Sequence, residues 1–572
     1  MTGRAPATDA AAALIGRLVE LGVRHVVLSP GSRSQALALV AAELEARGSI
    51  ALHVRIDERV AGFTALGIGR ESAMPAAVVC TSGTATANLL PAVLEAHHAG
   101  VPLLLLTADR PPELRGVGAN QTTRQPGMFA PNTRLDADVP VPEEVDDGAG
   151  EQSAMLRRIA EEAVAAALGA GTRQPGPVHL NLPYREPLGG ALPDWLGIPA
   201  IALAPPASGP DVFVDEPVEA EPSGALYQGG GGIGESNVPD DADPAPVALE
   251  PGPRTIVIAG ADAGPAAEAL ARAGGWPLVA EIVSGARFGP HLVHGYRALL
   301  ADPALGGRVE RAVVFGHPTL SREVVAVLSR PDLDVLAVRG PGEPLGLNGA
   351  TTAVDAVAAP APDDDDRQWL GEWMRASRAA SVDSEAIQID APIDRVGLVD
   401  AVWRATAGHD RLMFASSRLV RIADEVLGGK RVSVHANRGL AGIDGTIATG
   451  IGIAEAARRA GAPGLTRVVT GDLAFLHDVG ALLLAPGEQA PPIQLVVGND
   501  GGGTIFDGLE VARLASPQAL RRVLYTPQSV EISQLAAAYG WEYRRVATRT
   551  ALDQALTTPV AGCLLIEVPL AR

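Results

Sequence analysis

Short apolar runs alternate with helix-forming segments three times along this chain of 572 residues. In the first unit, strands are predicted at 25–29, 76–81, 101–107 and 178–182, with a helix at 84–98. In the second unit they are predicted at 255–259, 277–282, 312–315 and 335–338. In the third they are predicted at 412–415, 432–435, 467–470, 493–497 and 564–568. Buried strands that alternate with helices form parallel sheets covered on both faces. The pattern therefore predicts an α/β chain of three doubly wound domains with mainly parallel sheets.

We place a first domain at 1–186, a middle domain at 254–358 and a third domain at 390–572, joined by linkers at 187–253 and 359–389. The first linker contains a glycine run at 228–234 (QGGGGIG) that superficially resembles a phosphate loop. Because no strand precedes this run and no Lys-Ser/Thr follows it, we favour the linker interpretation. Four consecutive aspartates at 363–366 indicate a solvated connection to the third domain.

The composition excludes some classes of partner. The chain has 46 Lys and Arg against 66 Asp and Glu, a net charge of −20, so we expect binding neither to nucleic acid nor to an anionic membrane. An anionic substrate would instead need a local cluster of arginines. We expect a cytoplasmic protein without membrane insertion, because neither a signal peptide nor an apolar run of spanning length is recognisable. The two cysteines, Cys80 and Cys563, are expected to be small buried hydrophobes in a reduced compartment.

The strongest chemical signal lies in the third unit. One predicted strand ends in Gly471 and Asp472, and after 26 intervening residues a second ends in Asn499 and a glycine turn at 501–503. Ligands of parallel sheets sit beyond the carboxyl ends of the strands. A carboxylate, a carboxamide and the main-chain carbonyl of Gly501 would suit Mg²⁺, with Mn²⁺ as an alternative, and phosphate oxygens would complete its shell. Ordinary turns after strands are the competing interpretation of each motif alone. The pair at this spacing resembles the thiamine-diphosphate motif, although Leu473 and Asp500 depart from it.

A carboxylate suited to activating thiamine follows the predicted strand at 52–56. Glu58 stands where an apolar helix begins, and a carboxylate there is also favoured by the helix dipole, so simple capping is the alternative. In thiamine enzymes a glutamate at this kind of position protonates the aminopyrimidine ring. Glu58 is accordingly our candidate catalytic residue.

Four further blocks narrow the resemblance, and they lie at 29–34 (SPGSRS), 107–114 (TADRPPEL), 118–129 (GANQTTRQPGMF) and 437–445 (NRGLAGIDG). With the Asp-Glu-Arg at 57–59, they closely resemble the 2-succinyl-5-enolpyruvyl-6-hydroxy-3-cyclohexene-1-carboxylate synthase family of menaquinone biosynthesis. The resemblance covers the first and third units well, is weak in the middle unit and is absent from 206–250. It implies a thiamine-diphosphate-binding fold, with a pyrimidine-binding first domain and a diphosphate-binding third domain.

The resemblance also implies the reaction and the residues that serve it. 2-Oxoglutarate would be decarboxylated on the cofactor, and the succinyl-semialdehyde carbanion would add to isochorismate. Arginines pair with carboxylates in a bidentate manner, which suits two dicarboxylate substrates. The implied substrate contacts are Ser32, Arg33, Arg110, Asn120, Gln121, Ser417, Arg421, Arg438 and, in a loosely aligned segment, Arg322. The implied apolar contacts of the cofactor are Ile443, Ile505 and Phe506.

The resemblance further implies a homodimer or homotetramer in which each active site lies between two subunits. Each arginine taken alone is more simply explained as a surface charge. Two rival functions share the same fold: another thiamine enzyme, such as an acetolactate-synthase-like decarboxylase or synthase, and a non-catalytic cofactor-binding regulator. The first would not need the arginine clusters, and the second would not need Glu58 and the metal ligands.

Overall fold

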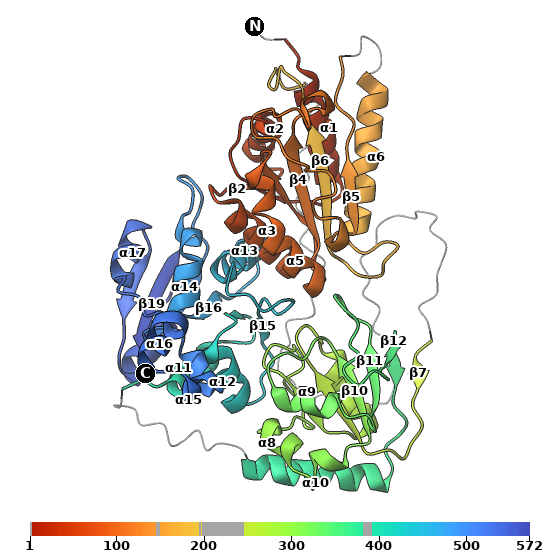
Figure 1. Cartoon of the computed structure of the whole chain (residues 1–572), viewed down its shortest axis with the longest axis vertical. Helices are drawn as coiled ribbons and strands as arrows, with labels where there is room; N and C mark the ends of the chain where they lie inside the picture. The colour runs from red at the N-terminus through yellow and green to blue at the C-terminus, as the bar shows by residue number, and fades with distance from the viewer. Residues whose placement is uncertain (1–2, 145–148, 194–195, 197–244, 381–391, 572) are drawn as a thin grey trace.

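A computed structural model describes residues 3–144, 149–193, 196, 245–380 and 392–571. Its strands form three larger sheets and one two-stranded sheet, and every ladder between named strands is parallel (Figure 1). The predicted α/β class is therefore confirmed. We use first, middle and third domain for the described residues up to 196, from 245 to 380 and from 392 to 571. The glycine run at 228–234 lies outside the described residues.

The first domain is built around a six-stranded sheet with the order β2-β1-β3-β4-β6-β5. The strands are β1 (His25–Leu28), β2 (Ala51–Val54), β3 (Ala76–Cys80), β4 (Leu103–Asp109), β5 (Leu135–Asp138) and β6 (Pro177–Pro183). The helices are α1 (Pro6–Glu20), α2 (Gln35–Ala46), α3 (Glu58–Ser72), α4 (Thr84–Ala87), α5 (Leu90–Ala99) and α6 (Ala149–Ala167). The central strands β3, β4 and β6 are buried along their whole length because helices cover both faces.

The third domain repeats this plan. Its sheet has the order β15-β14-β16-β17-β19-β18, which is the same order relative to the start of the domain as in the first sheet. The strands are β14 (Arg411–Phe414), β15 (Ser433–His435), β16 (Thr466–Gly471), β17 (Ile493–Asn499), β18 (Glu542–Arg545) and β19 (Cys563–Pro569). The helices are α11 (Arg395–Ala405), α12 (Arg418–Val426), α13 (Thr446–Arg459), α14 (Asp472–His477), α15 (Val511–Leu514), α16 (Pro517–Leu520), α17 (Ile532–Ala538) and α18 (Arg549–Thr557).

The middle domain has a five-stranded sheet with the order β12-β11-β10-β8-β9. Its strands are β8 (Thr255–Ala259), β9 (Leu278–Ala280), β10 (Arg311–Phe315), β11 (Asp334–Val338) and β12 (Thr352–Val354), and β7 (Val247–Ala248) pairs separately with β13 (Val357–Ala358). Its helices are α7 (Ala266–Gly274), α8 (Tyr296–Ala301), α9 (Arg322–Leu328) and α10 (Asp364–Ala380).

Two local predictions were wrong. The four aspartates do not form a solvated connection, because three of them open α10, whose Trp369 and Trp373 pack into the core of the middle domain. Asp366 is buried there and accepts a hydrogen bond from the indole nitrogen of Trp276 at 3.1 Å. The predicted helix at 84–98 is two helices, α4 and α5, and Pro91 lies in the first turn of α5, where its missing N–H costs nothing.

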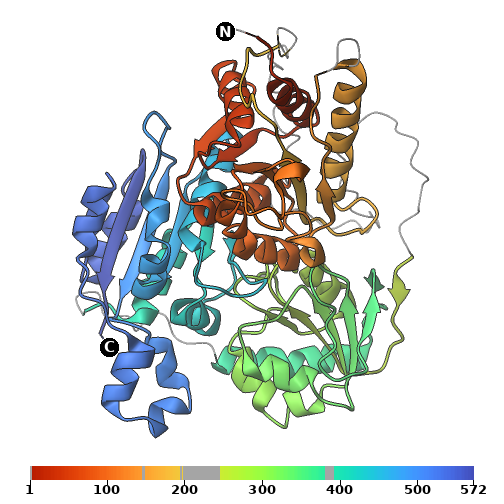
Figure 2. The same ribbon diagram turned by 45° about the horizontal axis from the view of Figure 1, so that its top comes forward.

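The first and third domains meet through α3 and α13, which each follow the second strand of their sheet (Figures 1 and 2). Two glycines allow the helices to cross in close contact. A Cβ atom at Gly67 would lie 2.0 Å from the carbonyl oxygen of Thr449, and one at Gly452 would lie 2.0 Å from that of Thr64. Any side chain at either position would therefore collide with the backbone of the opposite helix.

Candidate active site

Asp472 and Asn499 lie side by side at the carboxyl edge of the third sheet. The strands β16 and β17 are parallel neighbours, and their register pairs Gly471 with Gly498, so that the next residues of both strands are Asp472 and Asn499. This confirms the neighbourhood that the spacing predicts. It is also the edge at which parallel sheets bind ligands.

The side chain of Asp472 is buried and forms no ion pair with a cationic side chain of the described residues. It accepts a hydrogen bond from the backbone N–H of Leu473 at 2.9 Å. Burial, together with the nearby negative charge of Asp500, raises the pKa of Asp472 to about 6. A carboxylate that is desolvated and repelled in this way would be stabilised by a bound cation.

The side chain of Asn499 is oriented by Glu567 on the adjacent strand β19. The Asn499 amide nitrogen donates a hydrogen bond to the Glu567 carboxylate at 2.8 Å, which directs the amide oxygen away from Glu567. The other carboxylate oxygen of Glu567 accepts a hydrogen bond from the hydroxyl of Tyr543 at 2.5 Å. Asp500 is engaged elsewhere, because Arg395 donates to it at 2.8 Å. The amide oxygen of Asn499 accepts only a long hydrogen bond, from the N–H of Gly501 at 3.4 Å, so this oxygen keeps a lone pair for a cation, whereas the Asp500 carboxylate is engaged.

Glycines leave room beside these two side chains. A Cβ atom at Gly471 or at Gly501 would meet nothing within 4 Å, so open space adjoins both residues. Gly501 also has a φ of +75°, which other residues rarely adopt. A buried carboxylate, an oriented carboxamide and an accessible glycine backbone fit a Mg²⁺–diphosphate group, which requires hard oxygen ligands and close approach of the backbone.

Glu58 is the first residue of α3 and is half-buried. The capping of this helix is done by the preceding residue, since the Asp57 carboxylate accepts hydrogen bonds from the N–H groups of Arg59 at 2.8 Å and Val60 at 3.3 Å. Glu58 is therefore not the side-chain cap of the helix, although its place in the first turn still suits the helix dipole. Its position at the carboxyl end of β2 leaves it available for a ligand.

Two of the predicted substrate arginines lie close together in the first domain. Arg33 is buried and donates to the carbonyl oxygen of Tyr184 at 3.1 Å, while its Nε atom has no hydrogen-bond partner among the described residues. Burial and the positive charge of Arg110 lower the pKa of Arg33, and the negative charges of Glu186 and Asp109 oppose this shift only in part. Two cations held near each other, one with an unused donor, form a site suited to an anion.

The polar residues predicted beside these arginines are arranged differently. Gln121 has a φ of +56°, and its side chain donates to the carbonyl oxygen of Ser82 at 3.0 Å, so that this side chain is fixed by the turn after β3. Asn120 and Ser32 are exposed. All three are exposed and lie on loops that follow strands of the first sheet, but only the Gln121 side chain is held by a neighbouring turn.

Arg438 follows β15 and is buried among groups of two domains. It donates to Ser416 at 3.1 Å and, through two nitrogens, to the hydroxyl and carbonyl oxygens of Thr319 at 2.9 and 3.1 Å. Arg421 is exposed and donates to the carbonyl oxygen of Leu320 at 2.9 Å. A guanidinium group has five N–H donors, so described residues engage only part of the capacity of each arginine. Both arginines contact the same turn of the middle domain.

The remaining predicted residues are less tightly placed. Ser417 caps α12, since its hydroxyl accepts from the N–H of Leu419 at 3.2 Å. Ile443 precedes α13 with 39% of its surface exposed, while Ile505 and Phe506 are half-buried in the short helical turn Thr504–Gly508. Arg322 is exposed and lies 3.4 Å from Glu510, itself exposed, so this contact fixes it only weakly.

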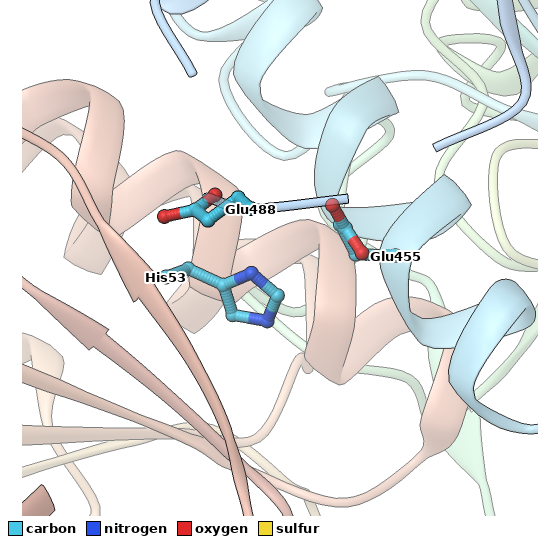
Figure 3. A group of neighbouring side chains, drawn as sticks. All are labelled: His53, Glu455 and Glu488. Carbon is cyan, nitrogen blue, oxygen red and sulfur yellow. The ribbon is translucent and has the colours of Figure 1, made fainter. Parts of the chain in front are cut away.

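A second cluster of potential metal ligands lies between the first and third domains (Figure 3). His53 of β2, Glu455 of α13 and Glu488 bring ligand atoms within 4.8 Å of one another. Each carboxylate already has a cationic partner, because Arg55 lies 2.8 Å from Glu488 and Arg458 lies 2.8 Å from Glu455. A divalent cation would be repelled by both arginines. We therefore assign this cluster to domain contact rather than to catalysis.

The sequence reasoning missed the residues that hold the predicted ones in place. Glu567 interrupts an apolar run, and a charge inside a buried strand could have signalled its role. Asp57, next to Glu58, could have been identified as the cap of α3. Thr319 gives no local signal, because its partner Arg438 lies 119 residues away.

Comparisons with known proteins agree with this geometry. Residues 8–128 match the model of the family described as thiamine pyrophosphate enzyme, N-terminal TPP binding domain. The chain is 51% identical over 609 residues to a protein of Leifsonia xyli subsp. xyli, covering 99% of this chain and 97% of that protein. It is 50% identical to a protein of Clavibacter michiganensis subsp. michiganensis, with 99% and 97% covered, and 43% identical to one of Kineococcus radiotolerans, with 99% and 96% covered. All three are named 2-succinyl-5-enolpyruvyl-6-hydroxy-3-cyclohexene-1-carboxylate synthase.

Proposed function

The chain belongs to the 2-succinyl-5-enolpyruvyl-6-hydroxy-3-cyclohexene-1-carboxylate synthase family, and from this premise we propose its substrates, its metal and its assembly. It is a thiamine-diphosphate-dependent transferase of menaquinone biosynthesis that forms a carbon–carbon bond. We propose that 2-oxoglutarate loses CO₂ and that its four-carbon remainder is added to isochorismate. The products are then 2-succinyl-5-enolpyruvyl-6-hydroxy-3-cyclohexene-1-carboxylate and CO₂.

The observation that carries the substrate assignment is the pair Arg33 and Arg110. Arg33 is buried with an unused Nε donor beside a second cation, in a chain whose net charge is −20. An acetolactate-synthase-like enzyme acting on monocarboxylates would not need two neighbouring arginines at this position. We propose that Arg33, Arg110, Arg421 and Arg438 bind the carboxylates of the two substrates, with Ser32, Asn120, Gln121, Ser417 and Arg322 as further contacts.

We propose that Asp472, Asn499 and the carbonyl oxygen of Gly501 hold Mg²⁺, which binds the diphosphate of the cofactor. Support comes from the buried carboxylate of Asp472 and from the orientation that Glu567 gives to Asn499. Gly471 would leave space for the diphosphate, and Ile443, Ile505 and Phe506 would contact the rings. Thiamine diphosphate, when bound, supplies the nucleophilic carbon at which the oxo acid reacts. Glu58 would exchange a proton with its aminopyrimidine ring.

The assembly is a further part of the proposal. We propose a homo-oligomer in which Glu58 of one chain and Asp472 of another serve the same site, and we propose the cytoplasm as its location. Within one chain, Arg59 also donates to the carbonyl oxygen of His477 at 2.9 Å, so the start of α3 lies near the end of α14. This contact favours a competing hypothesis, in which both residues of a site come from one chain. Among the helices that the structure describes, none is both long and apolar enough to cross a membrane.

The test is to measure CO₂ release from 2-oxoglutarate with and without isochorismate. The proposal expects release that depends on isochorismate and matches product formation one to one. An acetolactate-synthase-like enzyme would instead release CO₂ from pyruvate. A non-catalytic regulator would bind the cofactor and release none, and either result would contradict the proposal.

A further inference from the structure

Glu281 is a buried carboxylate of the middle domain that directly follows β9. One of its oxygens, Oε1, accepts hydrogen bonds from two consecutive backbone N–H groups, those of Thr319 at 2.9 Å and Leu320 at 2.7 Å. Its other oxygen has no hydrogen-bond partner among the described residues. Thr319 and Leu320 lie in the turn between β10 and α9, at the carboxyl edge of the middle sheet. Glu281 therefore fixes the backbone of this turn through the N–H groups of Thr319 and Leu320.

The opposite side of the same turn holds two arginines of the third domain. Arg438 donates two hydrogen bonds to Thr319, from Nε to the hydroxyl oxygen at 2.9 Å and from Nη2 to the carbonyl oxygen at 3.1 Å. The carbonyl oxygen of Leu320 accepts from Arg421 at 2.9 Å. One carboxylate in the middle domain is thus connected, through two peptide units, to both guanidinium groups.

The backbone next to Arg438 is held in a similar way from the first domain. Glu95 of α5 is buried, and its two oxygens accept from the N–H groups of Gly439 at 2.8 Å and Leu440 at 2.9 Å. Arg438 is therefore fixed on one side by a carboxylate of the first domain and on the other by a turn of the middle domain. Such arrangements restrict a side chain to one orientation before its ligand binds.

We propose that Glu281 is a positioning residue for substrate recognition, acting through the 319–320 turn to orient the guanidinium groups of Arg438 and Arg421. The inference rests on the proposed function, in which these arginines bind substrate carboxylates. It gives the middle domain a part in the reaction although none of its own groups needs to touch the reacting atoms. Removing the Glu281 carboxylate frees two buried N–H groups, and the turn can then move away from both arginines.

The experiment compares steady-state kinetics for both substrates in the holoenzymes of Glu281→Ala, Arg438→Ala and the double variant. Glu281→Ala is expected to raise KM for at least one dicarboxylate by about tenfold, the equivalent of one lost hydrogen bond, with a smaller change in kcat. Because Glu281 acts partly through Arg438, the rise in KM of the double variant should be clearly smaller than the product of the two single effects. Glu268→Ala, which removes another buried carboxylate of the middle domain, is the matched control and should leave KM unchanged.

Two conservative variants separate positioning from general stability. Glu281→Gln keeps the oxygen that accepts both N–H groups, so its KM should return towards the wild-type value. Thr319→Val removes only the hydroxyl that accepts from Arg438, and it should raise KM even if Glu281→Ala does not fold. Unchanged KM values in Thr319→Val and Glu281→Ala, with a raised KM in Arg438→Ala, would overturn the inference alone. An unchanged KM in Arg438→Ala would instead overturn the substrate assignment on which the inference rests.

Discussion

The side-chain amide of Asn499 donates a hydrogen bond to Glu567 at 2.8 Å, across the two neighbouring strands β17 and β19. This single contact decides which atom of Asn499 points towards the ligand edge of the sheet. With the nitrogen engaged, the oxygen, which accepts only from the N–H of Gly501 at 3.4 Å, keeps a lone pair for a cation. Loss of a group that orients a metal ligand through a hydrogen bond typically lowers metal affinity by roughly 10- to 100-fold.

Glu567→Ala should therefore weaken metal binding without removing a ligand. We expect the Mg²⁺ concentration for half-maximal activity to rise by roughly 10- to 100-fold, measured by titrating metal into chelator-treated enzyme. Glu542→Ala, which removes an exposed carboxylate from the adjacent strand β18, is the control and should titrate like wild type. An unaltered Mg²⁺ requirement in Glu567→Ala would show that Asn499 does not need this orientation, or that it is not a ligand.

Glu58→Gln should abolish turnover while cofactor affinity stays nearly normal. The amide occupies the same space but cannot donate the proton of a carboxyl group to the aminopyrimidine ring. Exchange of the proton at C2 of bound thiamine diphosphate, followed by NMR, should slow by orders of magnitude. Asp57→Asn serves for comparison, since it changes the helix cap and leaves Glu58 intact. Normal exchange in Glu58→Gln would rule out the assigned role.

Arg33→Ala should weaken the use of dicarboxylates far more than it weakens cofactor binding. Removing one charge-assisted contact to a desolvated carboxylate costs roughly 2–5 kcal/mol, which would appear in kcat/KM. Arg33→Lys should recover only part of the loss, because an ammonium group does not pair with a carboxylate in a bidentate manner. Arg47→Ala removes a surface arginine paired with Glu43 and should have no effect. The assignment fails if Arg33→Ala keeps wild-type kinetic constants for both substrates.

Mixing two inactive variants decides whether a site is shared between chains. Glu58→Gln and Asp472→Ala would be co-expressed so that their subunits pair at random. If each site combines the first domain of one chain with the third domain of another, one site of every mixed dimer carries no lesion, and roughly a quarter of wild-type activity should return. If Glu58 and Asp472 of the same chain form a site, as the contact of Arg59 with His477 favours, no activity should return. Each variant expressed alone gives the background.

Asp478 should make the stability of the protein depend on pH. Its carboxylate accepts hydrogen bonds from the N–H groups of Ile447 at 2.8 Å and Ala448 at 3.0 Å, and burial raises its pKa from 3.8 to about 7. The folded protein therefore holds a proton that the unfolded chain releases above its lower pKa. This contribution to stability is complete below the unfolded pKa and is lost as the pH rises towards the folded one.

The variant that tests this is Asp478→Asn, which keeps an oxygen for both N–H groups but cannot ionise. Between about pH 4 and about pH 7, the wild type should lose up to roughly 1.4 kcal/mol per pH unit relative to the variant. Thermal midpoints of both proteins measured across this range would show it as a changing difference. A constant difference between the thermal midpoints of the two proteins would mean that folding does not raise the pKa of Asp478.

The sequence predicted those elements well whose residue pattern alone decides their structure. The apolar run at 255–259 coincides with β8, and α3 begins at Glu58 as expected. The four aspartates misled because charge alone indicates solvent, whereas two tryptophans farther along decide that α10 packs on the middle domain. The site residues could likewise be predicted only where a local sequence pattern marks them. Asp472 and Asn499 follow strands with a recognisable pattern, but Glu281 and Glu567 act on partners distant in sequence, for which one chain offers no signal.

The crossing of α3 and α13 limits how this enzyme could be recombined with its relatives. At Gly67 and at Gly452, a carbonyl oxygen of the opposite helix lies where a Cβ atom would need space, so neither position can carry a side chain while the helices stay this close. The two helices are separated in the chain by the whole middle domain and by parts of the first and third domains, yet their surfaces must fit each other. A chimaera that took its first domain from one parent and its third from another would combine an α3 and an α13 whose surfaces are not complementary to each other. An exchange of the middle domain alone, which includes the 319–320 turn that meets Arg438, would leave the crossing of α3 and α13 intact.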